Sequence, residues 1–179
     1  MVRRARLHCA MAHPRVEQLR FARTEWQRGL VGLSDDDAVR RLMPMNSISW
    51  MGAHMAWHER LIWLQRAQGL TVEPTLDLVA SGQPASTPPL AETQETWRRV
   101  VDAADRYLDG LTTVDLERPP AHDTREIAPL LGTQAMLITY HYWSHIGEAS
   151  AIRQMLGHTD LPEWVGDLNG FAPFRREPD

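Results

Sequence analysis

The 179-residue sequence has no lysine, a single cysteine and no long apolar run, and each absence excludes a class of protein. All 19 basic residues are arginine, which excludes catalysis by a Schiff-base lysine and phosphate binding by a P-loop lysine. The lone Cys9 excludes an internal disulfide and a cysteine-rich zinc site. We expect Cys9 to be a small packing residue near the start of the first helix. The apolar runs are too short and too interrupted to span a bilayer.

The chain also lacks an excess of positive charge. Its 19 basic and 23 acidic residues leave a net charge of −4, so no basic field favours a nucleic-acid partner. The N-terminal residues include several arginines but no apolar core of the kind that a signal peptide needs. We therefore expect a cytoplasmic protein that binds neither nucleic acid nor membrane. An apolar fraction of 43% is typical of a globular protein, and the length is that of one domain with a full core.

Apolar residues recur at helical spacing in four long segments, and no segment alternates as a strand does. We predict long helices over about 14–32, 47–68, 90–109 and 124–157, and a short helix over about 35–42. Proline, serine or threonine at the predicted starts and glycine after the predicted ends support these boundaries. In the last helix Gly132 interrupts the pattern early, so its first turns are also compatible with a separate short helix.

Four long amphipathic helices predict an all-α fold, a four-helix bundle. We expect one domain over residues 1–179, with the bundle at about 8–157 and an irregular C-terminal arm at 158–179. The arm is expected to pack on the bundle or on a partner subunit. The connection over residues 70–89 is rich in proline, glycine and serine and breaks the helical period. A connector is the simpler interpretation, and the length of about twenty residues also leaves a functional lid open.

Four of the eight histidines form two pairs spaced four residues apart, one pair in each of two predicted helices. His54 and His58 lie in the segment SISWMGAHMAWHE, and His141 and His145 lie in HYWSHIGEASAIRQMLG. Residues four apart on an α-helix lie about 40° apart around the axis and about 6 Å along it, so each pair presents two imidazoles on one face. This geometry lets one helix give two nitrogen ligands to a metal ion. Because both stripes are otherwise apolar, a shared metal site is favoured over core or dimer-interface histidines.

The same two segments resemble the motifs of the DinB-like superfamily of small bacterial four-helix proteins, and AETQETWRRVVDAADRYLDGL between them is also similar. The resemblance extends from the first helix to Gly157. It implies an up-down-down-up bundle and a divalent metal held by one histidine of the second helix and by the HxxxH pair of the last. On this sequence those ligands are His54, His141 and His145. Three imidazoles leave a coordination position open, as catalytic sites do, and they suit zinc, nickel or ferrous iron.

Three further residues of these motifs need separate interpretations. Glu59 fits the family pattern, but on a helix it lies about 140° from His54, so we expect a structural role. His58 is an additional imidazole, which we interpret as supporting a ligand or lining the cavity, and a fourth ligand is the alternative. Glu148 stands where similar proteins often have glutamine. Its carboxylate is expected to hold the outer N–H of a ligand histidine or to accept a proton, and a solvated surface charge is the alternative.

Characterised proteins that this sequence resembles include metal-dependent thiol transferases and isomerases that use mycothiol or bacillithiol. The resemblance therefore implies a thiol S-transferase in which the metal lowers the pKa of the thiol and presents a thiolate to an electrophile. Catalytic proton transfer would fall to Glu148 or His58, and Arg153 is a candidate contact for an anionic co-substrate. Mycothiol is the expected co-substrate, and a homodimer is expected because similar bundles often pair. Metal-assisted hydrolysis and a non-catalytic, stress-associated metal-binding bundle are the alternatives.

Overall fold

The structure is a computed structural model that describes residues 12–163 and 165–176. These residues form helices and irregular segments and no β-strand, which confirms the predicted all-α fold. The long helices are α1 (Pro14–Gly29), α3 (Ile48–Glu59) with its π-helical continuation η1 (Arg60–Arg66), α4 (Leu90–Leu108) and α6 (Leu131–Met155). The short helices are α2 (Asp35–Val39), the 3₁₀-helix η2 (Pro74–Val79), α5 (Thr113–Leu116) and α7 (Leu168–Phe171). Cys9 lies outside the described residues.

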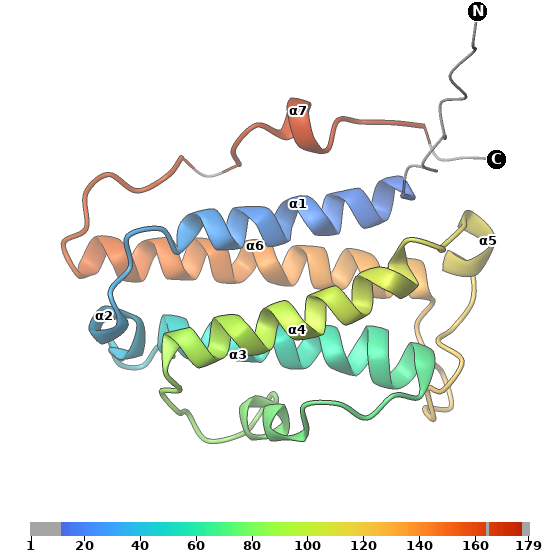
Figure 1. The fold of residues 1–179 in the computed structure, drawn as a ribbon, viewed down its shortest axis with the longest axis horizontal. Coiled ribbons are helices and arrows are strands. Elements are labelled where there is room, and N and C mark those ends of the chain that lie inside the picture. Colours follow the sequence, from blue (N-terminus) through green and yellow to red (C-terminus); the bar gives the residue numbers. More distant parts are fainter. Residues whose placement is uncertain (1–11, 164, 177–179) are drawn as a thin grey trace, which may run out of the picture.

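The four long helices lie side by side along the length of the molecule (Figure 1). α1 and α6 run in one direction and pack on each other, whereas α3 and α4 run in the opposite direction and form a second pair. α3 also contacts α6, so the two helices that carry the histidine motifs share an interface. In chain order the helices run up, down, down and up, as the resemblance implied. Among the described residues, no helix is long and apolar enough to cross a membrane.

The helix that carries His54 has a well-defined start and end. The Ser47 hydroxyl accepts a hydrogen bond from the backbone N–H of Trp50 and caps α3. At the other end, Gly69 has a φ of +70°, which glycine adopts without strain. A Cβ at Gly69 would lie 3.0 Å from the His122 ring, so glycine also permits the close approach of the connection between α5 and α6. These two signals explain why the sequence predicted both boundaries closely.

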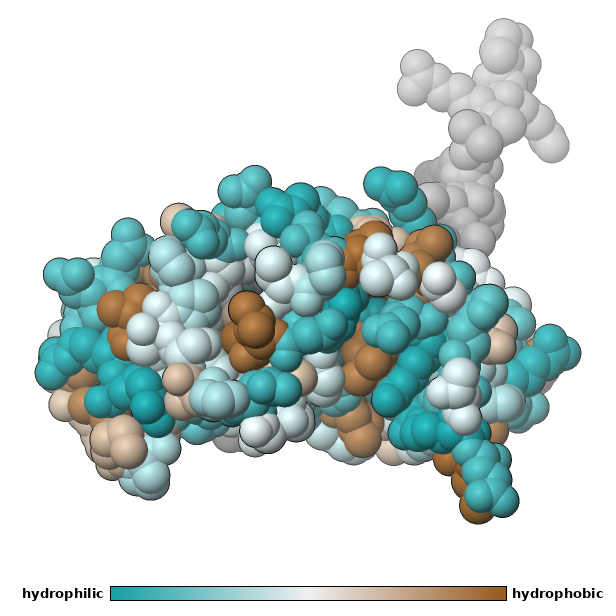
Figure 2. Space-filling model, turned by 90° about the horizontal axis from the view of Figure 1, so that it is seen from below, coloured by the Kyte–Doolittle hydropathy of each residue, from teal (hydrophilic) through white to brown (hydrophobic). Residues whose placement is uncertain are grey.

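The core lies between the four long helices and is built almost entirely from apolar side chains. Its largest fully buried members include Trp63, Tyr142, Leu19, Ile48 and Met51. Burying one such side chain stabilises a fold by about 1.5–3 kcal/mol, so the core accounts for most of the helix pairing. On the face shown in Figure 2, hydrophilic side chains predominate and exposed hydrophobic ones form small separate patches.

One ion pair interrupts this apolar core. Arg23 on α1 donates hydrogen bonds of 2.7 and 2.6 Å to the two carboxylate oxygens of Glu59, at the end of α3. It donates a third, of 2.7 Å, to Asp105 on α4. The side chains of Arg23 and Glu59 are 4% and 0% exposed. The pair therefore joins three helices, and the structural role expected for Glu59 is confirmed.

Two helices differ from their predictions. α6 begins at Leu131 and not near Thr124. The Asp123 carboxylate accepts hydrogen bonds from the backbone N–H and guanidinium of Arg125, which makes a turn there, and Pro129 disfavours helical backbone at the preceding residue. The second difference is that residues 60–66 are π-helical, although the sequence predicted a regular α-helix.

After α6 the chain returns along α1 as an extended segment that contains α7 (Figure 1). The side-chain amide of Gln18 donates a hydrogen bond to the carbonyl of Ala172 at 2.8 Å. The backbone N–H of Gly166 donates to the carboxylate of Glu25 at 2.9 Å. The described part of the C-terminal arm therefore packs on the bundle, which was one of the two expected arrangements.

Candidate metal centre

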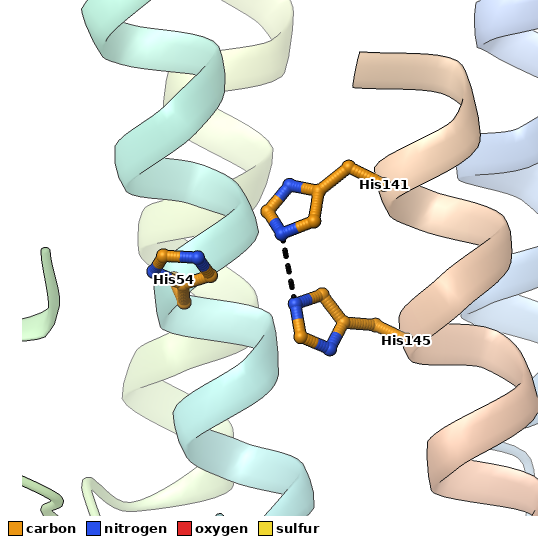
Figure 3. A group of neighbouring side chains, drawn as sticks. All are labelled: His54, His141 and His145. Carbon is orange, nitrogen blue, oxygen red and sulfur yellow. Dashed lines mark hydrogen bonds between the residues drawn. The ribbon is translucent and has the colours of Figure 1, made fainter. Parts of the chain in front are cut away.

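Three histidines from two helices meet between α3 and α6 (Figure 3). His54 comes from α3, and His141 and His145 come from successive turns of α6. One ring nitrogen of each histidine lies within 4.8 Å of the other two. The Nε2 atoms of His141 and His145 are 2.9 Å apart. The ring of His54 stands nearly perpendicular to both, at centroid distances of 5.0 and 5.7 Å. The structure therefore brings together the three residues predicted as a trio.

Two of these imidazoles are held from outside the cluster by oxygen atoms that can only accept hydrogen bonds. His54 Nδ1 donates to the carbonyl of Val79 at 2.7 Å. His145 Nδ1 donates to the Glu148 carboxylate at 2.9 Å. Because Nδ1 carries the proton in each neutral ring, the lone pair is on Nε2. Outer hydrogen bonds of this kind fix the tautomer and orientation of metal-binding histidines.

The third imidazole is held by the additional histidine. Nδ1 of His141 lies 2.9 Å from Nδ1 of His58, so one of the two rings donates to the other. The two rings are close to perpendicular, with centroids 4.8 Å apart. His58 therefore contacts the outer side of a predicted ligand, which agrees with a supporting role.

Tryptophan rings further restrict the orientation of His54. Trp50 stacks on it with centroids 4.6 Å apart and an interplanar angle of 11°. Trp57 stacks on it at 5.3 Å and 20°, and also stacks on His58 at 5.7 Å and 19°. The four rings form a near-parallel series along α3. Because His54 is held by two indoles and by the Val79 carbonyl, its Nε2 is fixed in place before any ligand binds.

Burial favours the neutral form of His54, His58 and His141. It is the main cause that lowers the pKa of His141 to about 3, and the neighbouring His145, His58 and His54 add to the effect. Burial likewise lowers the pKa of His58 to about 4 and lowers the pKa of His54. A neutral imidazole has a lone pair to give to a metal, whereas a protonated one has none. At neutral pH each of these three rings is therefore uncharged and keeps one nitrogen lone pair.

The donor set fits a divalent metal. Zinc–nitrogen bonds of about 2.0–2.1 Å in a tetrahedron place two nitrogens about 3.4 Å apart. The nitrogens of the cluster are spaced from 2.9 Å to at most 4.8 Å, which brackets that value, so small side-chain rotations are sufficient. Nickel and ferrous iron also accept imidazole nitrogen. Three protein ligands leave at least one coordination position for another molecule.

Comparison with known families identifies the family of the chain. The model of the DinB superfamily matches residues 18–149, which is most of the chain. The chain belongs to the DinB superfamily. No curated protein was found to match it. The matched region begins in α1, ends in α6 and includes all three histidines. Membership of the DinB superfamily and the three-histidine cluster are both compatible with metal binding.

Three aromatic residues lie beside His141 in the sequence, and two of them, Tyr142 and Trp143, pack in the bundle. Tyr142 is buried, and its hydroxyl accepts a hydrogen bond from the Trp97 indole at 2.7 Å. Trp143 packs on α1, whereas Tyr140 is exposed. The candidate role of Arg153 is wrong, because its buried guanidinium donates to the Gly29 carbonyl and to His158 and so ties α6 to the end of α1.

One contact of the histidine cluster was not found from the sequence. The Val79 carbonyl that holds His54 comes from η2, inside the 70–89 connection. Every residue has a backbone carbonyl, so the residue type at position 79 does not predict this contact. Only the position of the 70–89 connection in the structure shows it. The connection lies along α3 (Figure 1), and Arg60 on η1 forms a salt bridge with Asp77 of η2. The segment predicted as a connector or a lid is therefore part of the histidine site.

Proposed function

We propose that the protein binds a divalent metal through Nε2 of His54, His141 and His145 and acts as a thiol S-transferase with mycothiol as co-substrate. The observation that carries the metal site is the convergence of three imidazoles, each held at its outer nitrogen by a hydrogen bond. The reaction is supported by the resemblance to metal-dependent thiol transferases and by the open coordination that three ligands leave. We also propose the homodimer and the cytoplasmic location that the sequence predicted.

The chemistry needs a thiolate, an electrophile and a place for the thiol proton. A bound divalent metal would lower the pKa of a coordinated thiol so that the thiolate is available at neutral pH. With an aryl chloride as electrophile, the S–C bond forms, the C–Cl bond breaks, and chloride and one proton are released. The residues of the chain have to receive that proton and keep the three imidazoles in place.

We propose that Glu148 accepts the thiol proton and that His58 is a positioning residue. If Nε2 of His141 binds metal, His141 carries its proton on Nδ1 and donates it to Nδ1 of His58. The proton of His58 is then on Nε2, so this neutral ring has no lone pair left for the thiol proton. The Glu148 carboxylate has lone pairs beyond the one that accepts from His145. It is also part-exposed, so solvent can take the proton onward.

The metal part of the proposal is tested on protein purified without an affinity tag. Metal content is measured by mass spectrometry, and zinc, nickel and ferrous iron are titrated into metal-free protein by calorimetry. We expect one metal ion per chain. Protein that holds no metal and takes up none would overturn the whole proposal.

The reaction is tested separately, on metal-loaded protein with mycothiol and 1-chloro-2,4-dinitrobenzene, by following thioether formation. Turnover above the rate of the metal-free protein supports the S-transferase. Metal binding without thiol transfer would leave the metal site standing and reject this reaction. An ester hydrolysis assay on the same sample would then distinguish a metal-dependent hydrolase from a non-catalytic metal-binding bundle.

A further inference from the structure

The carbonyl that holds His54 belongs to a helix too short to be stable alone. Val79 is the last residue of η2, so its carbonyl has no partner further along the helix and is available to His54 Nδ1, 2.7 Å away. η2 has six residues, and a helix of that length does not persist in water without contacts to the rest of the protein. The position of this carbonyl, and with it the outer hydrogen bond of His54, therefore depends on the residues that anchor η2.

Two apolar side chains anchor one face of η2. Leu76 and Val79 are 5% and 6% exposed and belong to the core cluster. Residues three apart share a face of a 3₁₀-helix, so both side chains point into the bundle, whereas Leu78 between them is 71% exposed. Apolar contacts have no preferred direction, so these two residues hold η2 on α3 without fixing its position along that helix. A directional contact is needed to place the Val79 carbonyl opposite His54.

Arg60 supplies that directional contact. It is the first residue of η1, six residues after His54 on one continuous helix, and its side chain is 3% exposed. Its Nη2 forms a salt bridge with Asp77 of η2, and its Nη1 donates to the Val72 carbonyl at 3.3 Å. Among the described residues, its buried Nε makes no hydrogen bond, so both hydrogen bonds of this guanidinium go to the connection. Two contacts from one rigid fork fix the segment that precedes Val79 in direction and in position.

A second ion pair anchors the connection to a different helix. Arg99 of α4 donates a hydrogen bond of 2.8 Å to Glu73, the residue before η2. The two side chains are 49% and 25% exposed, and Arg99 also pairs with Glu95 at 3.0 Å. Ion pairs this exposed contribute little to stability. Because Glu73 lies in the same connection but is joined to α4, it serves as the matched control for Asp77.

We propose that Arg60 and Asp77 are positioning residues of the metal centre. Their salt bridge holds the Val79 carbonyl within reach of Nδ1 of His54. His54 then keeps its proton on Nδ1 and its lone pair on Nε2, in the orientation that the other two ligands need. The 70–89 connection thereby determines metal affinity, although none of the three proposed ligands comes from it. This inference rests on the metal site of the proposed function and does not depend on the thiol reaction.

The first test compares variants of the full chain by titrating zinc into metal-free protein. Asp77→Ala removes the carboxylate that directs η2 and should raise the Kd for zinc about tenfold or more, as the loss of an outer partner of a ligand histidine does. Glu73→Ala removes a carboxylate from the same connection and should change the Kd by less than about threefold. Asp77→Asn keeps an oxygen that can accept a hydrogen bond from Arg60 and should restore part of the lost affinity.

A second measurement separates positioning from a general loss of stability. NMR of metal-free protein with ¹⁵N-labelled histidine detects the Nδ1–H proton of His54 while a hydrogen bond protects it from exchange with water, and the signal is assigned by its absence in His54→Gln. We expect it in the wild type and in Glu73→Ala, and its loss or broadening in Asp77→Ala. The side chain of Asp77 is 65% exposed, so circular dichroism of this variant should match the wild type. A variant that is only less stable keeps the signal below its Tm.

The outcomes separate this proposal from the proposed function. Equal zinc affinity of Asp77→Ala and the wild type, or an unchanged His54 signal in that variant, would overturn the positioning role and leave the metal site standing. An equal loss of affinity in Glu73→Ala would overturn the specific role of Asp77. Wild-type protein that binds neither zinc, nickel nor ferrous iron would overturn this proposal together with the proposed function.

Discussion

The proton positions on the three clustered imidazoles follow from their outer partners. His54 and His145 donate from Nδ1 to oxygen, so their Nε2 atoms carry lone pairs whether or not a metal is bound. His141 is different, because its Nε2 faces another Nε2 and its Nδ1 faces His58. Without metal, Nε2 of His141 donates to His145; with metal, that proton must leave Nε2. His58 is therefore the residue that lets His141 change tautomer without becoming charged.

Replacement of a single ligand is the first prediction. His141→Ala removes one nitrogen of three and should abolish metal binding, because His54 and His145 alone cannot fill the site. Metal content after purification and a zinc titration measure the effect. His122→Ala is the matched control, since His122 is an exposed histidine of a connection, and it should bind metal normally. Full metal content in the His141→Ala protein would show that the ligands are assigned wrongly.

The second prediction separates the two roles of Glu148. In Glu148→Gln the amide oxygen can still accept the proton of His145 Nδ1, but it cannot take a thiol proton. Metal affinity should therefore fall by less than about tenfold while turnover falls by about a hundredfold or more. Glu148→Ala should lower metal affinity by about 10- to 100-fold, because His145 loses its outer partner. Equal turnover of the glutamine variant and the wild type would exclude Glu148 as the proton acceptor.

At the residue scale, residue type and helical spacing predicted the two histidine pairs and the structural role of Glu59, and the resemblance to DinB-like proteins selected His54, His141 and His145 from those pairs. The sequence left alternative roles open for His58 and for Glu148. Whether an imidazole four residues from His54 is a ligand or supports one depends on which ring it meets across the helix interface, and here it meets His141. The contact between His54 and the Val79 carbonyl could not be predicted from the sequence, because it involves a backbone atom.

At the scale of elements, the long helices were predictable and their irregularities were not. Apolar periodicity and caps such as Ser47 and Gly69 located α3 and its end. The π-helical turns of η1 have no side-chain cap and no glycine or proline within them that would predict them from the sequence. The late start of α6 follows from a turn made by Asp123 and Arg125, which helical periodicity does not describe.

The buried ion pair of Arg23 and Glu59 joins α1 to the end of α3, and it gives the third prediction. Arg23→Met leaves the Glu59 carboxylate buried without its partner, at 0% exposure. Unfolding by urea should show a loss of about 3–5 kcal/mol. The double change Arg23→Met and Glu59→Leu should recover most of this loss, because no charge is then left unpaired. Arg98→Met on the surface of α4 is the control and should change stability by less than about 0.5 kcal/mol.

At the scale of the whole molecule, the histidine cluster bridges the two helix pairs. His54 belongs to the α3–α4 pair, and His141 and His145 belong to the α1–α6 pair. A metal held by all three would connect segments about ninety residues apart in sequence, in the manner of a cross-link between the two pairs. An unfolded chain does not hold these three imidazoles together, so metal binding favours the folded state.

The last prediction follows from this linkage. A metal that binds the folded chain alone stabilises it by about 2.7 kcal/mol when its free concentration is a hundred times its Kd. For a protein of this length, that corresponds to a rise in Tm of about 5–10 °C, which differential scanning calorimetry detects. A chelator should reverse the rise. His141→Ala should show no rise at the same metal concentration, whereas Arg98→Gln should show the full one. If metal binds the wild type with one site and Tm does not change, the ion does not join the two helix pairs, and the assignment of His54 as the ligand from α3 fails.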